Sequence, residues 1–414
     1  MSPRCLFASI SAVLSSCPTA HAGSPASAEP AEEAASKPVG AVIGVFDRVR
    51  ADIAGRYSSG DDALSGRFAL DLAKTARLKR RLWIDYRSRG TVLFNNSDID
   101  GGNDRLSHNI IQGSLTLELS DRVVLETGVI NKFLGTGFGF NPTDIFRSDA
   151  GAFGLSLLPS ENRQNRSGRV MSRLSYTGEF GQVELIFAPK VRPGQLLKDF
   201  GVPSASEKGV LAAILSVDSA SFAPQLLFFR EGADLGIGGG FSQTLGDATV
   251  IYGEATYRSR SREIAQRNGP QFLSNFGASY ALKNTPLTLV VELHVNTESL
   301  SREAIEAAAR SSARSTEFAP AAEFSGFVGA PLRGTQLFTS IAATNIDHKR
   351  ISASVSSFFT LADRSTLFQV RLDKDFESGV TISSFAVANF GDDGTVFGTG
   401  GRNFRFALEL SKTF

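Results

Sequence analysis

The stretch Asn403 to Phe414 constrains the fold of this chain more than any other. Apolar residues stand at every second position and alternate with polar or small ones: Phe404, Phe406, Leu408 and Leu410 against Arg405, Ala407, Glu409 and Ser411. This period of two predicts a β-strand with one apolar and one polar face. A tilted strand of this length rises roughly 28 Å, which matches the apolar band of a membrane-spanning barrel. The alternative is an edge strand of a soluble β-sandwich.

The same alternation continues from about Arg48 to the last residue and predicts 18 strands, within a range of 16–18. The expected strands are 48–57, 67–72, 78–87, 109–120, 122–133, 169–178, 181–190, 208–218, 222–231, 233–244, 247–258, 270–282, 286–297, 334–346, 349–361, 365–376, 379–390 and 403–414.

The connections between these strands alternate in length. Tight turns are expected near Thr75, Asp121, Gly181, Ala220, Gly246, Asn284, Asp347 and Gly379. The connections between them are longer, apart from two short ones near Gly232 and Asp363. An all-β, antiparallel transmembrane barrel explains this pattern, since such barrels have short turns at one end and long loops at the other.

The final strand, ending in Phe414, resembles the closing strand of bacterial outer-membrane β-barrels of the porin-like type. That resemblance implies an integral outer-membrane protein with short periplasmic turns and longer outer loops. It also implies contacts with outer-membrane lipid and lipopolysaccharide, recognition of the last strand by the barrel-assembly machinery, and small solutes as cargo. A homo-oligomer is compatible with it, although no interface signature is present.

Composition agrees with a barrel and excludes a helical membrane protein. Mean hydropathy is −0.03 and the longest apolar runs, such as Val210 to Val217, are too short to cross a membrane as a helix. In a barrel only alternate residues meet lipid, so the bulk hydropathy stays near zero. A net charge of +1 gives no reason to expect a nucleic-acid partner.

The beginning of the chain reads as an export segment. A basic start, an apolar core and Ala20-His21-Ala22 before Gly23 predict a signal peptide over 1–22. Alternatively, Leu14 to Cys17 has the form of a lipobox, which would place a lipid on Cys17. Residues 23–40 are expected to be a disordered periplasmic leader, and residues 41–414 a single barrel.

The long loop from Leu134 to Gly168 follows the fifth predicted strand. In general bacterial porins the long loop at this place folds into the barrel, so the resemblance makes this loop the candidate constriction. Its start, Gly135 to Asp144, also resembles a segment of some uncharacterised outer-membrane proteins. A surface loop that never enters the pore is the alternative. The charged candidates in it are Asp144, Arg147, Asp149, Glu161, Arg163 and Arg166.

Basic residues gather on the polar face of the first three predicted strands and of the last one: Arg48, Arg50, Arg56, Arg67, Lys79, Arg81, Arg87 and Arg405. If this face lines the lumen, the wall favours anions. The alternative is a wall of paired charges without selectivity.

Glu292 and His294 share the polar face of one strand and are a candidate gate, or else hydrogen-bonded wall residues. No arrangement of residues predicts catalysis, a metal site or a cofactor. The leading hypothesis is therefore a passive outer-membrane channel for small hydrophilic solutes. A substrate-specific or hydrophobic-solute importer is the alternative, and an outer-membrane enzyme or an assembly or surface-interaction barrel is less favoured.

Overall fold

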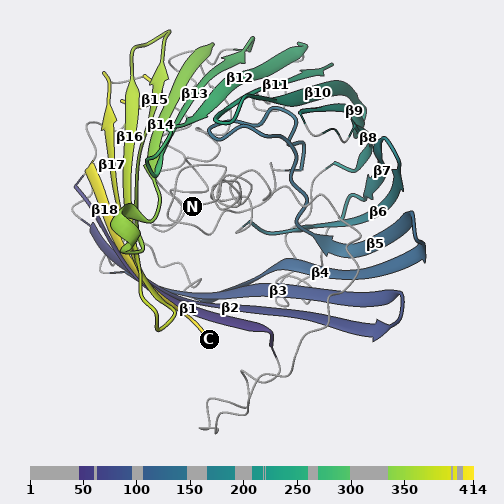
Figure 1. The fold of residues 1–414 in the computed structure, drawn as a ribbon, viewed down its shortest axis with the longest axis horizontal. Helices are drawn as coiled ribbons and strands as arrows, with labels where there is room; N and C mark the ends of the chain where they lie inside the picture. Colours follow the sequence, from purple (N-terminus) through teal and green to yellow (C-terminus); the bar gives the residue numbers. More distant parts are fainter. Residues whose placement is uncertain are drawn as a thin grey trace, which may run out of the picture. The chain divides into compact units, whose positions relative to one another are not determined.

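The computed structural model describes residues 46–59, 63–95, 106–146, 166–191, 208–217, 219, 221–259, 269–298, 334–392, 395–398 and 404–414. These residues form 18 strands in one antiparallel sheet, which confirms the predicted fold (Figure 1). The strands are β1 Arg48–Ser58, β2 Ala63–Lys79, β3 Leu82–Asn95, β4 Leu106–Ser120, β5 Val123–Ile130, β6 Arg169–Gly178, β7 Gly181–Ala188, β8 Val210–Val217, β9 Phe222–Glu231, β10 Asp234–Leu245, β11 Thr249–Arg258, β12 Gln271–Ala281, β13 Leu287–Asn296, β14 Thr335–Ala343, β15 Ile351–Thr360, β16 Thr366–Asp375, β17 Val380–Phe390 and β18 Phe404–Thr413.

Each strand pairs with the next along the chain, and the sheet closes on itself where β18 pairs with β1. In this closing pair Ile53 lies opposite Leu410, and the backbone N–H of Phe414 donates to the carbonyl of Val49 at 2.9 Å. Closure leaves no free sheet edge along these strands, which is the condition that lipid places on a spanning sheet.

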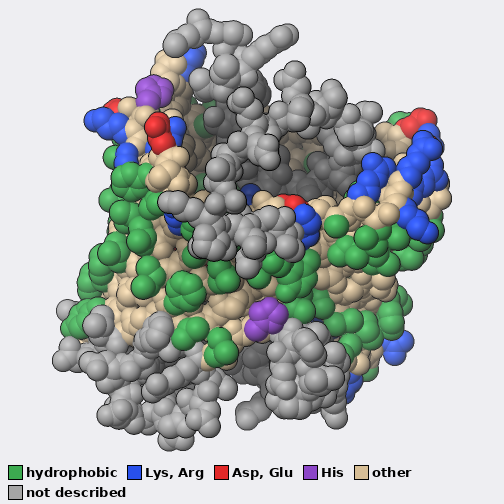
Figure 2. All heavy atoms as spheres, turned by 90° about the horizontal axis from the view of Figure 1, so that it is seen from below, with side chains coloured by type: hydrophobic (Ala, Val, Ile, Leu, Met, Phe, Trp, Pro, Cys, Tyr) green, Lys and Arg blue, Asp and Glu red, His purple; other side chains and the backbone are tan. Residues whose placement is uncertain are grey.

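Side chains alternate between the two surfaces of the barrel. In β1, Ile53 is 56% exposed on the outside, whereas the next residue towards the N-terminus, Asp52, is 1% exposed on the inside. Figure 2 shows the result on one face of the molecule: hydrophobic side chains form a broad band, and Lys and Arg gather along a rim beside it. An apolar outside around a polar inside is the distribution of a transmembrane barrel.

The turn between β2 and β3 differs from the prediction. The turn expected near Thr75 lies at Arg80 and Arg81 instead, so β2 is 17 residues long. Thr75 is paired with Asp85 inside the strand, and its hydroxyl donates to the Asp85 carboxylate at 2.8 Å. The register shifts between Arg77 and Lys79, which allows the alternation to break before the turn. Arg80 and Arg81, which the prediction placed inside the strand 78–87, therefore form the turn.

Two apolar clusters lie inside the barrel. One is on the β6–β9 wall and includes Met171, Ile186 and Ile214; the other is on the β13–β17 wall and includes Phe338 and Phe358. No helix within the described ranges has the length and apolar character needed to cross a membrane. The predicted signal peptide, lipobox and leader lie outside the described residues.

Candidate functional site in the barrel lumen

The wall at the barrel seam carries a buried network of ion pairs across β18, β1, β2 and β3. The carboxylate of Asp52 lies 3.0 Å from Arg67 and 2.5 Å from Arg89. Glu409 in turn lies 2.9 Å from both Arg67 and Arg50. The side chains of Asp52, Arg67 and Arg89 are at most 5% exposed. This part of the wall therefore consists of alternating, paired charges.

The structure places the residues of the predicted basic face in different surroundings. Arg50 and Arg67 line the lumen but are paired with carboxylates, as the alternative reading expected. Arg56 and Arg405 also stand at lumen-facing positions of β1 and β18. Arg48 and Arg87 line an open cavity.

Lys79 and Arg81 lie elsewhere, at the turn between β2 and β3. Both are exposed, and Arg81 pairs with Asp121 of the neighbouring turn at 2.9 Å. They are not part of the lumen wall because the hairpin turns later than the sequence indicated.

Residues 131–146, here called the lumen-crossing segment, leave the end of β5 and run inside the barrel to the wall formed by β11–β14 (Figure 1). The Asn275 side chain donates to the carbonyl of Phe140 at 2.8 Å, and the Thr256 hydroxyl donates to the carbonyl of Pro142 at 2.8 Å. The first part of the predicted 134–168 loop therefore lies in the lumen.

Glu254 of β11 holds the beginning of this segment. Its carboxylate accepts hydrogen bonds from the backbone N–H groups of Thr136 and Gly137, the latter at 2.9 Å. The hydroxyl of Thr143 donates to its other oxygen at 2.7 Å. Glu254 is 5% exposed, so these donors replace the water that a charged carboxylate requires.

Glu292 of β13 does the same for the next two residues. The N–H groups of Phe138 and Gly139 donate to it at 2.5 and 2.8 Å. Tyr252 donates from its hydroxyl at 2.7 Å, and His294 Nε2 lies 2.8 Å away. Glu292 and His294 are both 0% exposed. The two predicted gate residues thus contact each other and the lumen-crossing segment.

Glycines make this close approach possible. A Cβ on Gly139 would lie 2.8 Å from the Phe338 ring and 2.9 Å from the His294 ring. Gly135 has a φ of +89°, a conformation that other residues rarely adopt. With Gly137 between them, glycines stand at every second position, and the backbone N–H groups of residues 136–139 reach the two wall carboxylates.

The ends of the segment are held by different contacts. Leu134, Ile145 and Phe146 belong to the apolar cluster on the β6–β9 wall. Asp144 forms a buried ion pair with Arg166 at 2.7 Å. The other predicted charged residues of this loop lie outside the described residues: Arg147, Asp149, Glu161 and Arg163.

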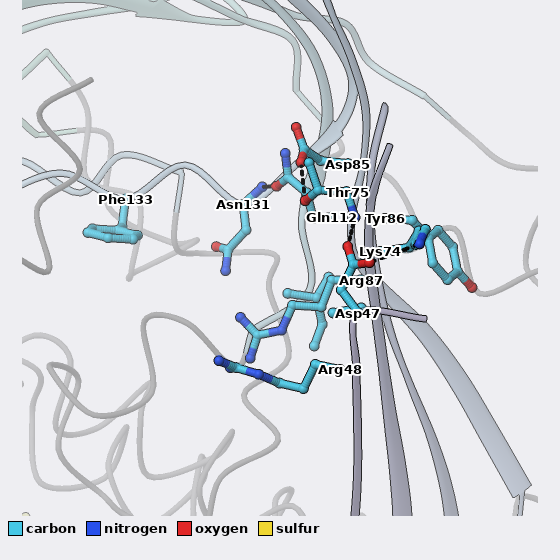
Figure 3. A pocket seen from close by; sticks show the side chains of 12 residues that line it. Asp47, Arg48, Lys74, Thr75, Asp85, Tyr86, Arg87, Gln112, Asn131 and Phe133 are labelled. Atoms are coloured by element: carbon cyan, nitrogen blue, oxygen red, sulfur yellow. Dashed lines mark hydrogen bonds and ion pairs between the residues drawn. The ribbon is translucent and has the colours of Figure 1, made fainter. Parts of the chain in front are cut away.

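A cavity of about 490 Å³ adjoins the start of β1 and is lined by residues of β1–β4 and of the lumen-crossing segment (Figure 3). Arg48 and Arg87 extend into it from the wall, and Asn131 and Phe133 of the lumen-crossing segment stand across from them. At its edge, hydrogen bonds from Lys74 and from the backbone N–H of Thr75 lower the pKa of Asp47 below its usual value. The cavity is thus a basic and polar part of the lumen.

Sequence reasoning missed Glu254, Tyr252 and Asn275, which hold the segment. A signal was present: Glu254 is an acidic residue on the inward face of a strand whose outward face is apolar. The sequence did not indicate which loop it would meet.

No protein-family model matches the sequence, and no curated protein matches it. Solved structures with the same fold do exist. OccK5 (OpdH) of Pseudomonas aeruginosa matches with a TM-score of 0.58 and 9% identity, over 89% of this chain and 97% of that one. OccAB4 of Acinetobacter baumannii matches with 0.55 and 11%, over 89% and 98%. OpdK of Pseudomonas aeruginosa, solved with vanillate, matches with 0.55 and 11%, over 89% and 99%. The chain shares the β-barrel fold of these outer-membrane proteins.

Proposed function

We propose that this protein is an outer-membrane channel for the passive diffusion of small hydrophilic solutes. The observation that carries the proposal is the division of the lumen. Apolar clusters and the lumen-crossing segment fill the β6–β9 and β11–β17 sides, while a polar, charged cavity remains beside β1–β4. A polar lumen inside an apolar belt is what a water-filled pore requires.

Arg48 and Arg87 give the passage its charge preference. They line the cavity, and Arg50 and Arg67 form ion pairs with Glu409 and Asp52 in the wall. The passage therefore has a modest preference for anions, contributed mainly by the cavity.

Purified protein in planar bilayers tests the proposal. We expect discrete conductance steps, and in a salt gradient a reversal potential on the anion side. A folded barrel that shows no conductance at any voltage would overturn the channel function. A reversal potential on the cation side would overturn only the charge preference.

A substrate-specific channel is the second candidate, favoured by the shape of the cavity. It places guanidinium groups of Arg48 and Arg87 opposite the ring of Phe133, an arrangement suited to a small solute with both a charge and an apolar part. The OpdK structure, with the same fold, holds vanillate. Liposome swelling that admits one class of small anions and excludes neutral sugars would favour this candidate over general diffusion.

The remaining predictions accompany the channel proposal. The chain is not an enzyme on this view, and its outward band contacts membrane lipid and lipopolysaccharide. Its last strand is the element that the assembly machinery would recognise. A homo-oligomer is compatible with the proposal. Mass spectrometry of the mature protein tests the export segment: an N-terminus at Gly23 supports simple cleavage, and an acylated Cys17 supports the lipobox.

A further inference from the structure

The tip of the lumen-crossing segment is attached to the wall through its main chain. Four consecutive N–H groups, from Thr136 to Gly139, point at two carboxylates on different strands, Glu254 and Glu292. Hydrogen bonds from N–H groups to an ionised carboxylate are stronger than those between neutral groups. Successive N–H groups around an anion form a recognised binding arrangement, and here the anions belong to the barrel itself.

The tip and the ends of the segment are held independently. The ends are fixed by apolar packing of Leu134, Ile145 and Phe146 against the β6–β9 wall and by the Asp144–Arg166 ion pair. None of these contacts involves Glu254 or Glu292. Weakening the two carboxylates would therefore loosen the tip, which Asn275 and Thr256 also hold, while leaving the segment rooted inside the barrel.

Among the described residues, the two sides of the segment differ. The β11–β14 wall carries the buried rings of Phe338 and His294, with Phe358 of β15 packed beside them. The His294 ring also contacts the ring of Phe140 in the segment, with the ring centroids 5.5 Å apart. The cavity lined by Arg48 and Arg87 is on the other side of the segment. A tip that leaves its wall would move away from these packed rings, towards the cavity.

We infer that Glu254 and Glu292 are positioning residues that keep the passage open by holding the segment tip against the opposite wall. This inference rests on the proposed channel function. It assigns the two glutamates a role in the continuity of the current rather than in ion selectivity, because neither faces the cavity.

The double variant Glu254→Gln and Glu292→Gln tests it. Each carboxamide keeps one acceptor oxygen but turns an NH₂ donor towards backbone N–H groups, so the attachment weakens without a change in side-chain size. In single-channel recordings we expect frequent brief closures, with the closed-to-open ratio raised about tenfold, equivalent to roughly 1.4 kcal/mol.

A second variant that deletes residues 136–140 separates the tip from its attachment. Without a tip there is nothing to enter the passage, so we expect a steady current at least as large as that of the unmodified protein. Glu118→Gln is the matched control, because Glu118 lies at a lumen-facing position of β4 and its side chain forms no hydrogen bond or ion pair among the described residues. It should leave the closures unchanged.

The outcomes discriminate clearly. A silent unmodified protein sinks the channel function itself. The positioning role is overturned if the unmodified protein conducts and the double variant shows no closures. Heat-modifiable gel mobility establishes that the double variant is folded. A steady increase of current in the double variant also overturns it, because the tip would then have been a barrier rather than an element held out of the way.

Discussion

Arg67 and Glu409 stand 342 residues apart in the sequence and form an ion pair of 2.9 Å across the barrel seam. Their side chains are 5% and 11% exposed. Arg67 also pairs with Asp52, so the first and last strands are joined by charge as well as by backbone hydrogen bonds. Removing any one of these charged groups leaves its partners with fewer opposite charges beside them.

Asp52→Asn should destabilise the barrel strongly. The change leaves Arg67 and Arg89 buried without this carboxylate, and breaking a buried pair in this way costs about 3–5 kcal/mol. Urea unfolding of protein reconstituted in vesicles measures the free energy of unfolding. Asp121→Asn is the control: its side chain is 91% exposed beside Arg81, so little or no change is expected. Equal effects of the two substitutions would contradict the assigned role of the seam network.

Arg48→Glu should move the ion preference of the channel towards cations. Arg48 extends into the open cavity, and reversing its charge acts directly on ions that pass it. The reversal potential in a potassium chloride gradient measures this shift. Arg81→Glu, at the exposed turn outside the lumen wall, should shift it much less. An Arg48 variant with an unchanged reversal potential would place the ion path elsewhere.

Gly139→Ala should disturb the lumen-crossing segment. The new methyl group would lie 2.8 Å from the Phe338 ring and 2.9 Å from the His294 ring, both fully buried. Overpacking of this kind costs about 1–3 kcal/mol, and here the simplest relief is displacement of the segment tip. Single-channel closures and the unfolding midpoint report the effect. Gly55→Ala, where a Cβ meets no atom within 4 Å, should behave like the unmodified protein.

Val291→Arg tests the assignment of the outer surface to lipid. Val291 is 50% exposed on the outward face of β13, and an arginine on the lipid face near the bilayer midplane costs about 2–4 kcal/mol. Thr116→Arg is the comparison, because Thr116 shares the lumen-facing side of β4 with Ser114, whose hydroxyl bonds Glu126. The free energy of unfolding in vesicles is compared for the two variants. If it is equal, the face containing Val291 does not contact lipid.

The barrel itself could be predicted from the sequence, since alternation and turn residues are local signals. The short turns predicted after the one between β2 and β3 fall between the observed strands, and the last strand pairs with the first as a closed barrel requires. The first turn was misplaced because β2 contains a register shift near Arg77, which a strict period of two does not anticipate.

The interior could be predicted only in part. Lumen-facing positions follow from alternation, so the inward placement of Arg50 and Arg67 was accessible. Their partners were not, because Glu409 and Asp52 meet them only after the barrel closes. The attachment of the segment to Glu254 depends on which strands of the barrel wall lie opposite β5, and no local sequence pattern carries that information.

The seam network also bears on how the barrel is completed. Because side chains alternate with a period of two, pairing β18 one residue out of place would turn Glu409 towards lipid, and a slip of two would carry it away from Arg50 and Arg67. Only the correct pairing satisfies all of these charges. The network therefore favours the one alignment of β18 with β1 in which the charges at the two ends of the chain are paired.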